Sequence, residues 1–380
     1  MKYKPYTVKD VKKASNENKF TVISCFAGGG GSSTGYRLAG GNILLINEFV
    51  EEAIASYKKN YPDTPVLVDD IKKYAGKDFL DKVKLKEGEL DILDGSPPCS
   101  AFSVAGKREK GWDKTKTYSD GKSVENIEDL FLDFIRVAKD IKPKVIVAEN
   151  VKGITFGEAT KKLNEFVKAF ENIGYYVTYK VLNAADFGVP QARERTIFIC
   201  VREDVADAIG LSWINLIGIF PNEFGYQISM EDAIESIKND EAEVKELRDF
   251  YEGSFQKKFL DPIPFRPKRH MKPSDPEFRE WNPKASCFNM IRPCPTMPSP
   301  TLTQQGQKKG LSGVFHYAEN RKLTIKELRR LMSLPEDYEL TGTFDQQAER
   351  IGRMVAPKMM AEVAKSIYEN VLKPYNEVSK

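Results

Sequence analysis

The chain has 380 residues, of which 41% are hydrophobic, and its 58 Lys and Arg residues nearly balance its 55 Asp and Glu residues. This length exceeds that of a typical single domain, so we expect two domains. The net charge of +3 neither requires nor excludes an anionic partner. The sequence shows no secretory signal pattern and no apolar run long enough to cross a bilayer, which excludes membrane-embedded classes and predicts a cytoplasmic protein.

The cysteine pattern argues against a metal site. The five cysteines are scattered, no pair forms a C-x-x-C motif, and only His270 and His316 could join them as ligands. We therefore expect reduced thiols and no bound metal.

The first half of the chain alternates short apolar runs with amphipathic segments. The apolar runs predict strands at FTVISCFA (20–27), NILLIN (42–47), PVLVD (65–69), ELDILDG (89–95), KVIVAEN (144–150) and TIFICVR (196–202), with a further short strand at Lys180–Asn183. The segment EDLFLDFIRVAKDI (128–141) has the periodicity of a helix. Such alternation is typical of an α/β fold with a parallel, doubly wound sheet.

The pattern changes after Arg202. From Glu203 to Leu302, proline, aromatic and basic residues interleave and periodicity weakens, which indicates a separate, loop-rich recognition region. Helical periodicity returns in TIKELRRLMSL (324–334) and in a long segment that includes 348–372, which we expect to pack back on the first domain. We therefore predict one domain from residues 1–202, completed by a C-terminal helix over 346–380, and a second from residues 203–345.

A glycine-rich turn follows the first strand. In ISCFAGGGGSSTG (23–35) a strand enters the turn and a helix is expected to start near Ser33. Glycines such as Gly28 and Gly30, next to Phe26, permit positive φ and a close ligand approach, and the helix start offers free N–H groups. An ordinary tight turn is the alternative for this motif taken alone.

The next two strands also end in residues suited to a nucleoside. Glu48 ends the second strand, where a Rossmann-like site places an acid that binds ribose hydroxyls, and Phe49 could stack on an adenine. Asp70 and Ile71 follow the third strand. An acid at a strand end is usually just solvated, but three successive strand ends of this kind predict a nucleoside-containing cofactor.

Three downstream motifs carry chemistry. Cys99 lies in GSPPCSAFS, Glu149 lies in AEN at the end of a strand, and Arg193 and Arg195 lie in QARER. A thiolate is a nucleophile, a carboxyl group can exchange a proton with a ring nitrogen, and two arginines at i and i+2 could share one face of a strand. Each residue alone could equally be structural, whereas together they predict an enzyme.

This series of motifs resembles the cytosine-C5 DNA methyltransferase family from Phe20 to about Val363. The matching blocks are FAGGGGSSTG, PPCSAFS, EDLF, ENVKG, QARER, RKLTIKELRRLMSLP and IGRMV. The resemblance implies a Rossmann-like methyltransferase fold that binds S-adenosylmethionine, with residues 1–202 as the catalytic domain and 203–345 as the target recognition domain and hinge. It further implies a bacterial or phage setting, a link to restriction-modification systems, and a monomer acting on double-stranded DNA.

The resemblance also implies roles for individual residues. Cys99 would add to carbon 6 of a flipped cytosine, Glu149 would act at ring nitrogen 3, and Arg193 and Arg195 would support them. The implied cofactor pocket comprises Phe26, Gly28, Gly30, Glu48, Phe49, Asp70, Ile71, Pro98, Leu130, Arg353 and Val355. In the recognition region, a minority of Lys257, Lys258, Arg266, Lys268, Arg269 and Lys272 is expected to touch DNA.

Three alternatives stay open. Arg353 stands where the family usually has Asn beside the transferred methyl group, so the donor could be carboxy-S-adenosylmethionine, with Arg353 binding its carboxylate and 5-carboxymethylcytosine as product. Cys287–Asn289 (CFN) faintly resembles a string of the tRNA-methylating branch, which makes tRNA a second substrate candidate. An inactive nucleic-acid binder is disfavoured because it would not need Cys99, Glu149 and both arginines.

Overall fold

The computed structural model describes residues 2–97, 116–117, 123–124, 129–255, 257–278, 290–309 and 312–379. These residues form two compact units. The sheet unit contains Lys9–Leu182, Glu194–Asn222 and Met360–Lys380, and the loop-rich unit contains Met1–Val8, Asn183–Arg193 and Glu223–Met359. Whether the functional boundary follows the predicted division, 1–202 with 346–380 against 203–345, stays a prediction.

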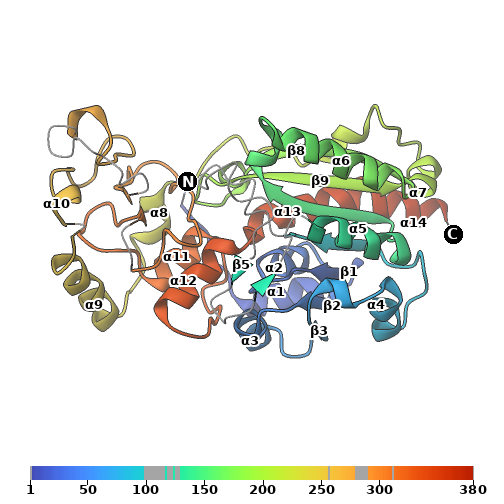
Figure 1. Cartoon of the computed structure of the whole chain (residues 1–380), viewed down its shortest axis with the longest axis horizontal. Coiled ribbons are helices and arrows are strands. Elements are labelled where there is room, and N and C mark those ends of the chain that lie inside the picture. The colour runs from blue at the N-terminus through green and yellow to red at the C-terminus, as the bar shows by residue number, and fades with distance from the viewer. Residues whose placement is uncertain are drawn as a thin grey trace. The chain divides into compact units, whose positions relative to one another are not determined.

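A seven-stranded sheet organises the sheet unit (Figure 1). Its order is β3 (Val66–Val68), β2 (Gly41–Glu48), β1 (Phe20–Cys25), β4 (Ile92–Gly95), β7 (Val145–Val151), β9 (Glu194–Arg202) and β8 (Tyr175–Asn183). The strands from β3 to β7 pair in parallel, as predicted. The α/β fold class is therefore confirmed.

Strand β9 departs from the predicted all-parallel sheet, because it pairs antiparallel with β7. Only residues 184–193, with the short 3-10 helix Ala184–Phe187, connect β8 to β9. A parallel neighbour needs a crossover of about a dozen or more residues, usually including an α-helix. The connection is too short for that crossover, so β9 returns in the opposite direction.

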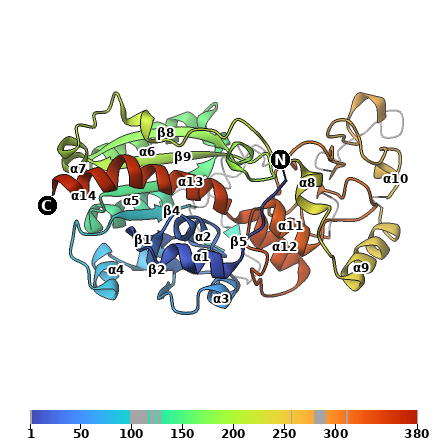
Figure 2. The same ribbon diagram turned by 180° about the vertical axis from the view of Figure 1, so that it is seen from behind.

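Helices cover both faces of the sheet, as the two opposite views in Figures 1 and 2 show. Helices α5 and α6 lie over one face, and α13 and α14 lie over the other. The helices of this unit are α1 (Val8–Ser15), α2 (Gly31–Leu38), α3 (Glu51–Asn60), α4 (Gly76–Val83), α5 (Asp129–Ile141), α6 (Ala159–Glu171), α7 (Glu203–Ala208), α13 (Pro357–Ile367) and α14 (Lys373–Val378). The apolar core between the sheet and the α5 face includes Ile23, Phe134, Ile146, Phe166 and Phe198.

The C-terminal segment is not the single helix expected over 346–380. Helix α12 (Phe344–Arg353) ends before Met354, whose backbone is extended, and α13 begins at Pro357. The residue before a proline avoids the helical region, and proline lacks the N–H that a continuous helix needs. A π-helical turn, Tyr368–Leu372, then joins α13 to α14.

The loop-rich unit has short elements. These are α8 (Met230–Ile234), α9 (Glu241–Glu252), α10 (Lys257–Leu260), α11 (Ile325–Leu331), α12, and the parallel pair β10 (Met290–Ile291) and β11 (Gly313–Val314). A small apolar core includes Tyr251, Leu260, Ile263 and Phe315. Elsewhere, β5 (Lys116–Thr117) and β6 (Ser123–Val124) form an antiparallel pair.

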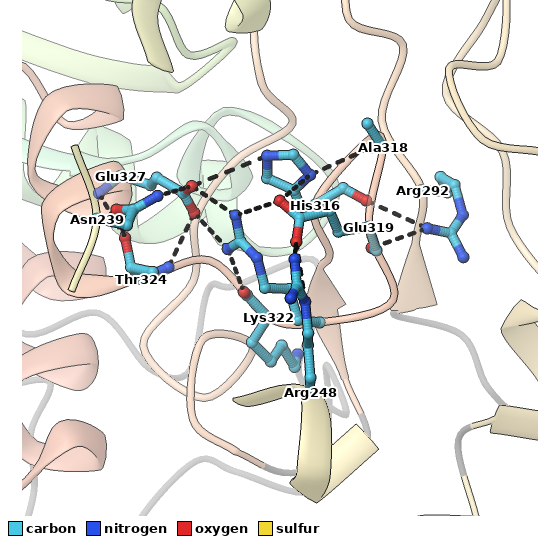
Figure 3. A network of polar contacts seen from close by, with 10 residues as sticks. Asn239, Arg248, Arg292, His316, Ala318, Glu319, Lys322, Thr324 and Glu327 are labelled. Atoms are coloured by element: carbon cyan, nitrogen blue, oxygen red, sulfur yellow. Dashed lines mark hydrogen bonds and ion pairs between the residues drawn. The ribbon is translucent and has the colours of Figure 1, made fainter. Parts of the chain in front are cut away.

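Buried arginines cross-link the loop-rich unit where regular backbone pairing is scarce. Arg321 donates to both carboxylate oxygens of Glu327 at 2.8 Å and to Glu319 at 3.0 Å. Arg292 donates to the carbonyl oxygens of His316 and Glu319, each at 3.2 Å. Figure 3 shows this network, in which charged donors satisfy carbonyl and carboxylate groups that lie outside the β-strands.

Candidate active site

The glycine-rich turn after β1 has the backbone geometry that the sequence predicts. Gly28 has φ +55° and Gly30, the residue before α2, has φ +93°. Phe26 also has a positive φ, +54°, which is uncommon for a bulky residue and marks local strain of the kind that clusters at binding sites. Its ring packs 6.4 Å, centroid to centroid, from Phe134 of α5. The strain at Phe26 had no signal in the sequence.

Glu48 closes this turn from the end of β2. Its Oε2 accepts the N–H of Gly28 at 2.7 Å, and its Oε1 accepts the N–H groups of Phe49 and Val50, each at 2.9 Å. The residue is only 8% exposed, so three backbone donors fix the orientation of a buried carboxylate. A carboxylate offers about four acceptor positions, so Oε2 keeps capacity for one further hydroxyl donor. This arrangement fits the ribose of S-adenosylmethionine.

The residues after β3 are also well defined. The Asp70 side chain accepts the N–H of Lys72 at 3.0 Å and caps the 3-10 helix Ile71–Lys73. Ile71 is buried, and its carbonyl oxygen accepts Arg136 of α5 at 3.1 Å. Leu130, near the start of α5, is buried as well. These residues and the turn belong to the sheet unit, whereas Pro98 lies outside the described residues.

A buried acid lies beside this turn, and sequence analysis missed it. Asp94 of β4 is 1% exposed and accepts the hydroxyl groups of Ser24, Ser32 and Tyr36. Burial raises the pKa of Asp94 to about 6, and the nearby charge of Glu149 adds to this rise. The available signal was an acid inside the otherwise apolar strand ELDILDG.

Glu149 and Arg195 form an ion pair. Nε of Arg195 lies 2.8 Å from Oε1 of Glu149, and the two side chains are 13% and 11% exposed. The pairing register of β7 and β9 places Val151 opposite Arg195 and Glu149 opposite Ile197, so Glu149 and Arg195 are diagonal neighbours on one face. The structure therefore brings two of the candidate site residues, Glu149 and Arg195, into direct contact.

Arg193 has a different environment from Arg195. It belongs to the loop-rich unit, is 2% exposed, and donates to the carbonyl oxygens of Leu302 at 3.0 Å, Gly352 at 3.0 Å and Met354 at 2.8 Å. These bonds tie the segment before β9 to the end of α12. Within its unit Arg193 thus holds backbone in place.

The end of α12 carries the unusual arginine. Arg353 forms an ion pair with Glu349 one helical turn earlier, and Lys308 Nζ lies 2.6 Å from the other oxygen of Glu349. These cations lower the pKa of Glu349, although burial opposes them. Val355, which lies in the segment that joins α12 to α13, is buried. Arg353 is therefore paired with an acid of its own chain.

The basic residues of the recognition region differ in their contacts. Lys257 pairs with Glu252 and Asp261, Arg266 pairs with Glu231, and Arg269 pairs with Asp275 and Glu277. Within the described part of the chain, no ion pair involves Lys258, Lys268 or Lys272. Lys258 instead lies over Phe255, with Nζ 3.6 Å from the ring centroid.

Cys99, the predicted nucleophile, and Cys287–Asn289, which suggested a tRNA branch, lie outside the described residues. Across the residues that are described, His, Cys, Asp and Glu side chains form no cluster of three or more suited to a metal ion. Among the same residues, no helix has the length and apolar character to cross a membrane.

Comparison with known proteins decides the family. The model of the family described as C-5 cytosine-specific DNA methylase matches residues 20–369. The chain belongs to this family. It is accordingly a DNA cytosine-5-methyltransferase that uses S-adenosylmethionine, as the resemblance implied.

Curated relatives agree with this assignment, and a solved structure has a similar fold. The methylase is 32% identical to the type II methyltransferase M1.HphI of Haemophilus parahaemolyticus, over 91% of this chain and 86% of that protein. It is 30% identical to M.Eco47II of Escherichia coli, over 94% and 81% of the two chains. A variant of Spodoptera frugiperda DNMT2 has a similar fold, with a TM-score of 0.61, 18% identity, and coverage of 92% and 99%.

Proposed function

We propose that this methylase modifies carbon 5 of a cytosine flipped out of duplex DNA, with Cys99 as nucleophile and Glu149 as the group that acts on ring nitrogen 3. The observation that carries the proposal is the ion pair of Glu149 with Arg195 at the end of β7. The pair keeps the carboxyl group oriented on one face of the sheet. The working unit in this proposal is one chain on one duplex.

The chemistry assigns each residue a task. Carbon 5 of cytosine is a weak nucleophile, and addition of the Cys99 thiolate to carbon 6 makes it an enamine carbon. The addition moves electron density toward ring nitrogen 3, where Glu149 supplies a proton or a hydrogen bond. After the methyl group has been accepted, a water molecule takes the proton from carbon 5, and the electron pair of that C–H bond re-forms the double bond to carbon 6 and expels the Cys99 thiolate.

Residues of the sheet unit would hold the cofactor. Glu48 would accept a ribose hydroxyl at Oε2, Phe49 and Ile71 would contact the adenine with Asp70, and the Phe26 turn with Gly28, Gly30 and Leu130 would face the rest of the molecule. Pro98, Arg353 and Val355 stay proposed members of the pocket. When bound, S-adenosylmethionine supplies an electrophilic methyl group on its sulfonium.

We further propose that the donor is ordinary S-adenosylmethionine and not its carboxy derivative. A carboxylate on the donor would be needed if the Arg353 charge lacked compensation. Glu349 already provides a carboxylate to Arg353, which supports the ordinary donor. The enzyme and DNA are incubated with each donor separately, and the nucleosides are then analysed by mass. Ordinary S-adenosylmethionine should give 5-methylcytosine. If only the carboxy derivative gave a product, 5-carboxymethylcytosine, this choice would be reversed.

Covalent trapping tests the nucleophile. A duplex with 5-fluorocytosine at the target should capture the wild-type enzyme, because fluorine cannot leave carbon 5 as a cation and the adduct persists. Cys99→Ser should bind the duplex but give no adduct. Cys294→Ser, which changes a buried cysteine of the loop-rich unit, should trap normally. Adduct formation by Cys99→Ser would refute the assignment, and trapping on a 5-fluorocytosine tRNA in preference to DNA would favour the tRNA alternative.

A further inference from the structure

Asp94 links the glycine-rich turn to the centre of the sheet. Its Oδ2 accepts the hydroxyl of Ser24 on β1 at 2.6 Å and of Ser32 on α2 at 2.8 Å, and its Oδ1 accepts Tyr36 on α2 at 3.1 Å. Ser24 is also the register partner of Asp94 across β1 and β4. One carboxylate thereby holds two residues of the helix that follows the turn, Ser32 and Tyr36.

The same register connects Asp94 to the catalytic carboxylate. Asp94 is opposite Val147 on β7, and Glu149 is the next residue on that face of β7. The charge of Glu149 contributes to the raised pKa of Asp94, which places the two groups within electrostatic reach. Asp94 therefore lies between the glycine-rich turn and the Glu149–Arg195 pair.

An ionised carboxylate at this position is costly for folding. Asp94 is 1% exposed, no cation is among its hydrogen-bond partners in the described residues, and its three partners are hydroxyl groups that a neutral amide could also satisfy. A group kept in spite of such a cost is a candidate for function. The nearest functional element is the turn itself, which it contacts through Ser32.

We propose that Asp94 is a positioning residue whose buried negative charge makes the glycine-rich turn prefer a cationic ligand over a neutral one. S-adenosylmethionine carries a sulfonium, whereas the product S-adenosylhomocysteine carries a neutral thioether at the same position. A buried charge is little screened by solvent, so it can distinguish the two ligands without touching them. The inference rests on the proposed assignment of the turn and Glu48 to the cofactor.

Two other titratable groups pack against Asp94. Burial raises the pKa of Cys25 on β1 and of Tyr36 on α2 well above their usual values, and the Asp94 charge raises both further. Both groups therefore stay neutral between pH 5.5 and 8. Glu149 on β7, with its partner Arg195, also faces Asp94, and the carboxylate of Glu48 contacts the turn itself at Gly28.

Calorimetric titration of the full-length enzyme with each ligand tests the proposal. At pH 8, Asp94→Asn should weaken S-adenosylmethionine about ten-fold and S-adenosylhomocysteine by less than about two-fold, as expected for loss of one buried charge. Asp91→Asn is the matched control: Asp91 adjoins the start of β4, contacts Thr21 and Lys144, and should leave the ratio unchanged. An unchanged ratio in Asp94→Asn, or an equal loss for both ligands, would overturn the proposal.

Wild-type protein provides a second measurement if Asp94→Asn does not fold. The affinity for S-adenosylmethionine divided by the affinity for S-adenosylhomocysteine should fall as the pH decreases from 8 to 5.5, because Asp94 gains a proton. A ratio that stays constant over this range contradicts the proposal. Both ligands share the same amino and carboxyl groups, so the titration of those groups cancels. Glu48→Gln separates the two assignments: it should weaken both ligands, and if it weakens neither, the proposed cofactor site fails whatever Asp94 does.

Discussion

Arg195 holds the carboxylate of Glu149 across two antiparallel strands, with Nε 2.8 Å from Oε1. Both side chains are largely shielded from solvent, so the interaction is less screened than a surface ion pair. Antiparallel pairing makes the contact possible, because it brings a residue from the start of β9 beside one near the end of β7. If β9 were parallel to β7, its first residues would lie beside the start of β7, far from Glu149.

Removal of this arginine should slow catalysis more than it weakens DNA binding. Arg195→Met frees the Glu149 carboxylate to rotate, and we expect kcat to fall about 100-fold, in the range of losses typical of a misplaced general acid. Lys152→Met is the control, because it breaks the neighbouring exposed pair with Glu194 and should leave kcat within about two-fold. Steady-state kinetics and filter binding measure both effects; a kcat for Arg195→Met equal to that of Lys152→Met would contradict this role.

His316 should make the loop-rich unit acid-sensitive. Burial lowers the pKa of His316 to about 4, and its Nδ1 accepts the N–H of Ala318 at 3.2 Å (Figure 3). The folded state therefore favours the neutral imidazole, so stability is lost as pH falls from about 6.5 toward 4. Between pH 7.5 and 5 the loss is about 2 kcal/mol.

His316→Asn tests this dependence, because its side-chain oxygen can still accept the Ala318 N–H but does not titrate. Urea unfolding at pH 7.5 and 5 should show that wild-type protein loses about 2 kcal/mol more stability than the variant, because the other titrating groups are common to both proteins. The pKa of Glu319 is lowered to about 2, and that of Glu327 is also lowered. The stabilisation that these two carboxylates provide is lost only below about pH 4.5, so neither contributes in this window. Parallel pH profiles for the two proteins would disprove the assignment to His316.

Asp94 should have the opposite pH dependence. Its pKa of about 6 lies above the unfolded value, so the folded state favours the protonated form and stability is lost as pH rises from about 4 to 6. The full change is about 3 kcal/mol, of which about 1 kcal/mol falls between pH 5 and 7.5. Asp94→Asn should lack this component in urea unfolding. If wild-type protein gained stability relative to Asp94→Asn over this range, the ionised form would be the favoured one.

The sequence predicts where most strands of the sheet lie, but it does not predict the direction of β9 or the helix boundary before Pro357. Apolar runs such as 20–27 and 144–150 became β1 and β7, because strands buried on both faces are nearly continuous in hydrophobicity. The same runs carry no information on strand direction, so they do not predict that β9 is antiparallel. At 346–380 the helical periodicity continued across Pro357, although that proline separates α12 from α13.

For the candidate site, the sequence places residues at neighbouring strand ends, but it does not reveal the contacts that depend on burial. Glu48 and Gly28 come from adjacent strand ends, and their contact follows from the βα pattern. Arg193 and Arg195 are two residues apart, yet one contacts backbone carbonyls of the loop-rich unit and the other contacts Glu149. Asp94 depends on hydroxyl partners up to 70 positions away in the chain, which local spacing cannot reveal.

Ion pairing within the recognition region predicts which cations contact DNA phosphates. Lys258 and Lys268 are exposed and have no ion-pair partner among the residues described, whereas Lys257 and Arg269 are each held by two acids. A cation already neutralised within the protein releases few counterions from DNA.

The double variant Lys258→Ala and Lys268→Ala should weaken DNA binding and reduce the slope of log K against log salt by about 2, since each phosphate contact contributes about 0.9. Lys257→Ala with Arg269→Ala is the matched control and should leave the slope nearly unchanged. Fluorescence anisotropy with one duplex across a salt series gives both slopes. A larger change in the control pair would show that the internal ion pairs open on DNA, and that exposure in the free protein does not identify the contacts.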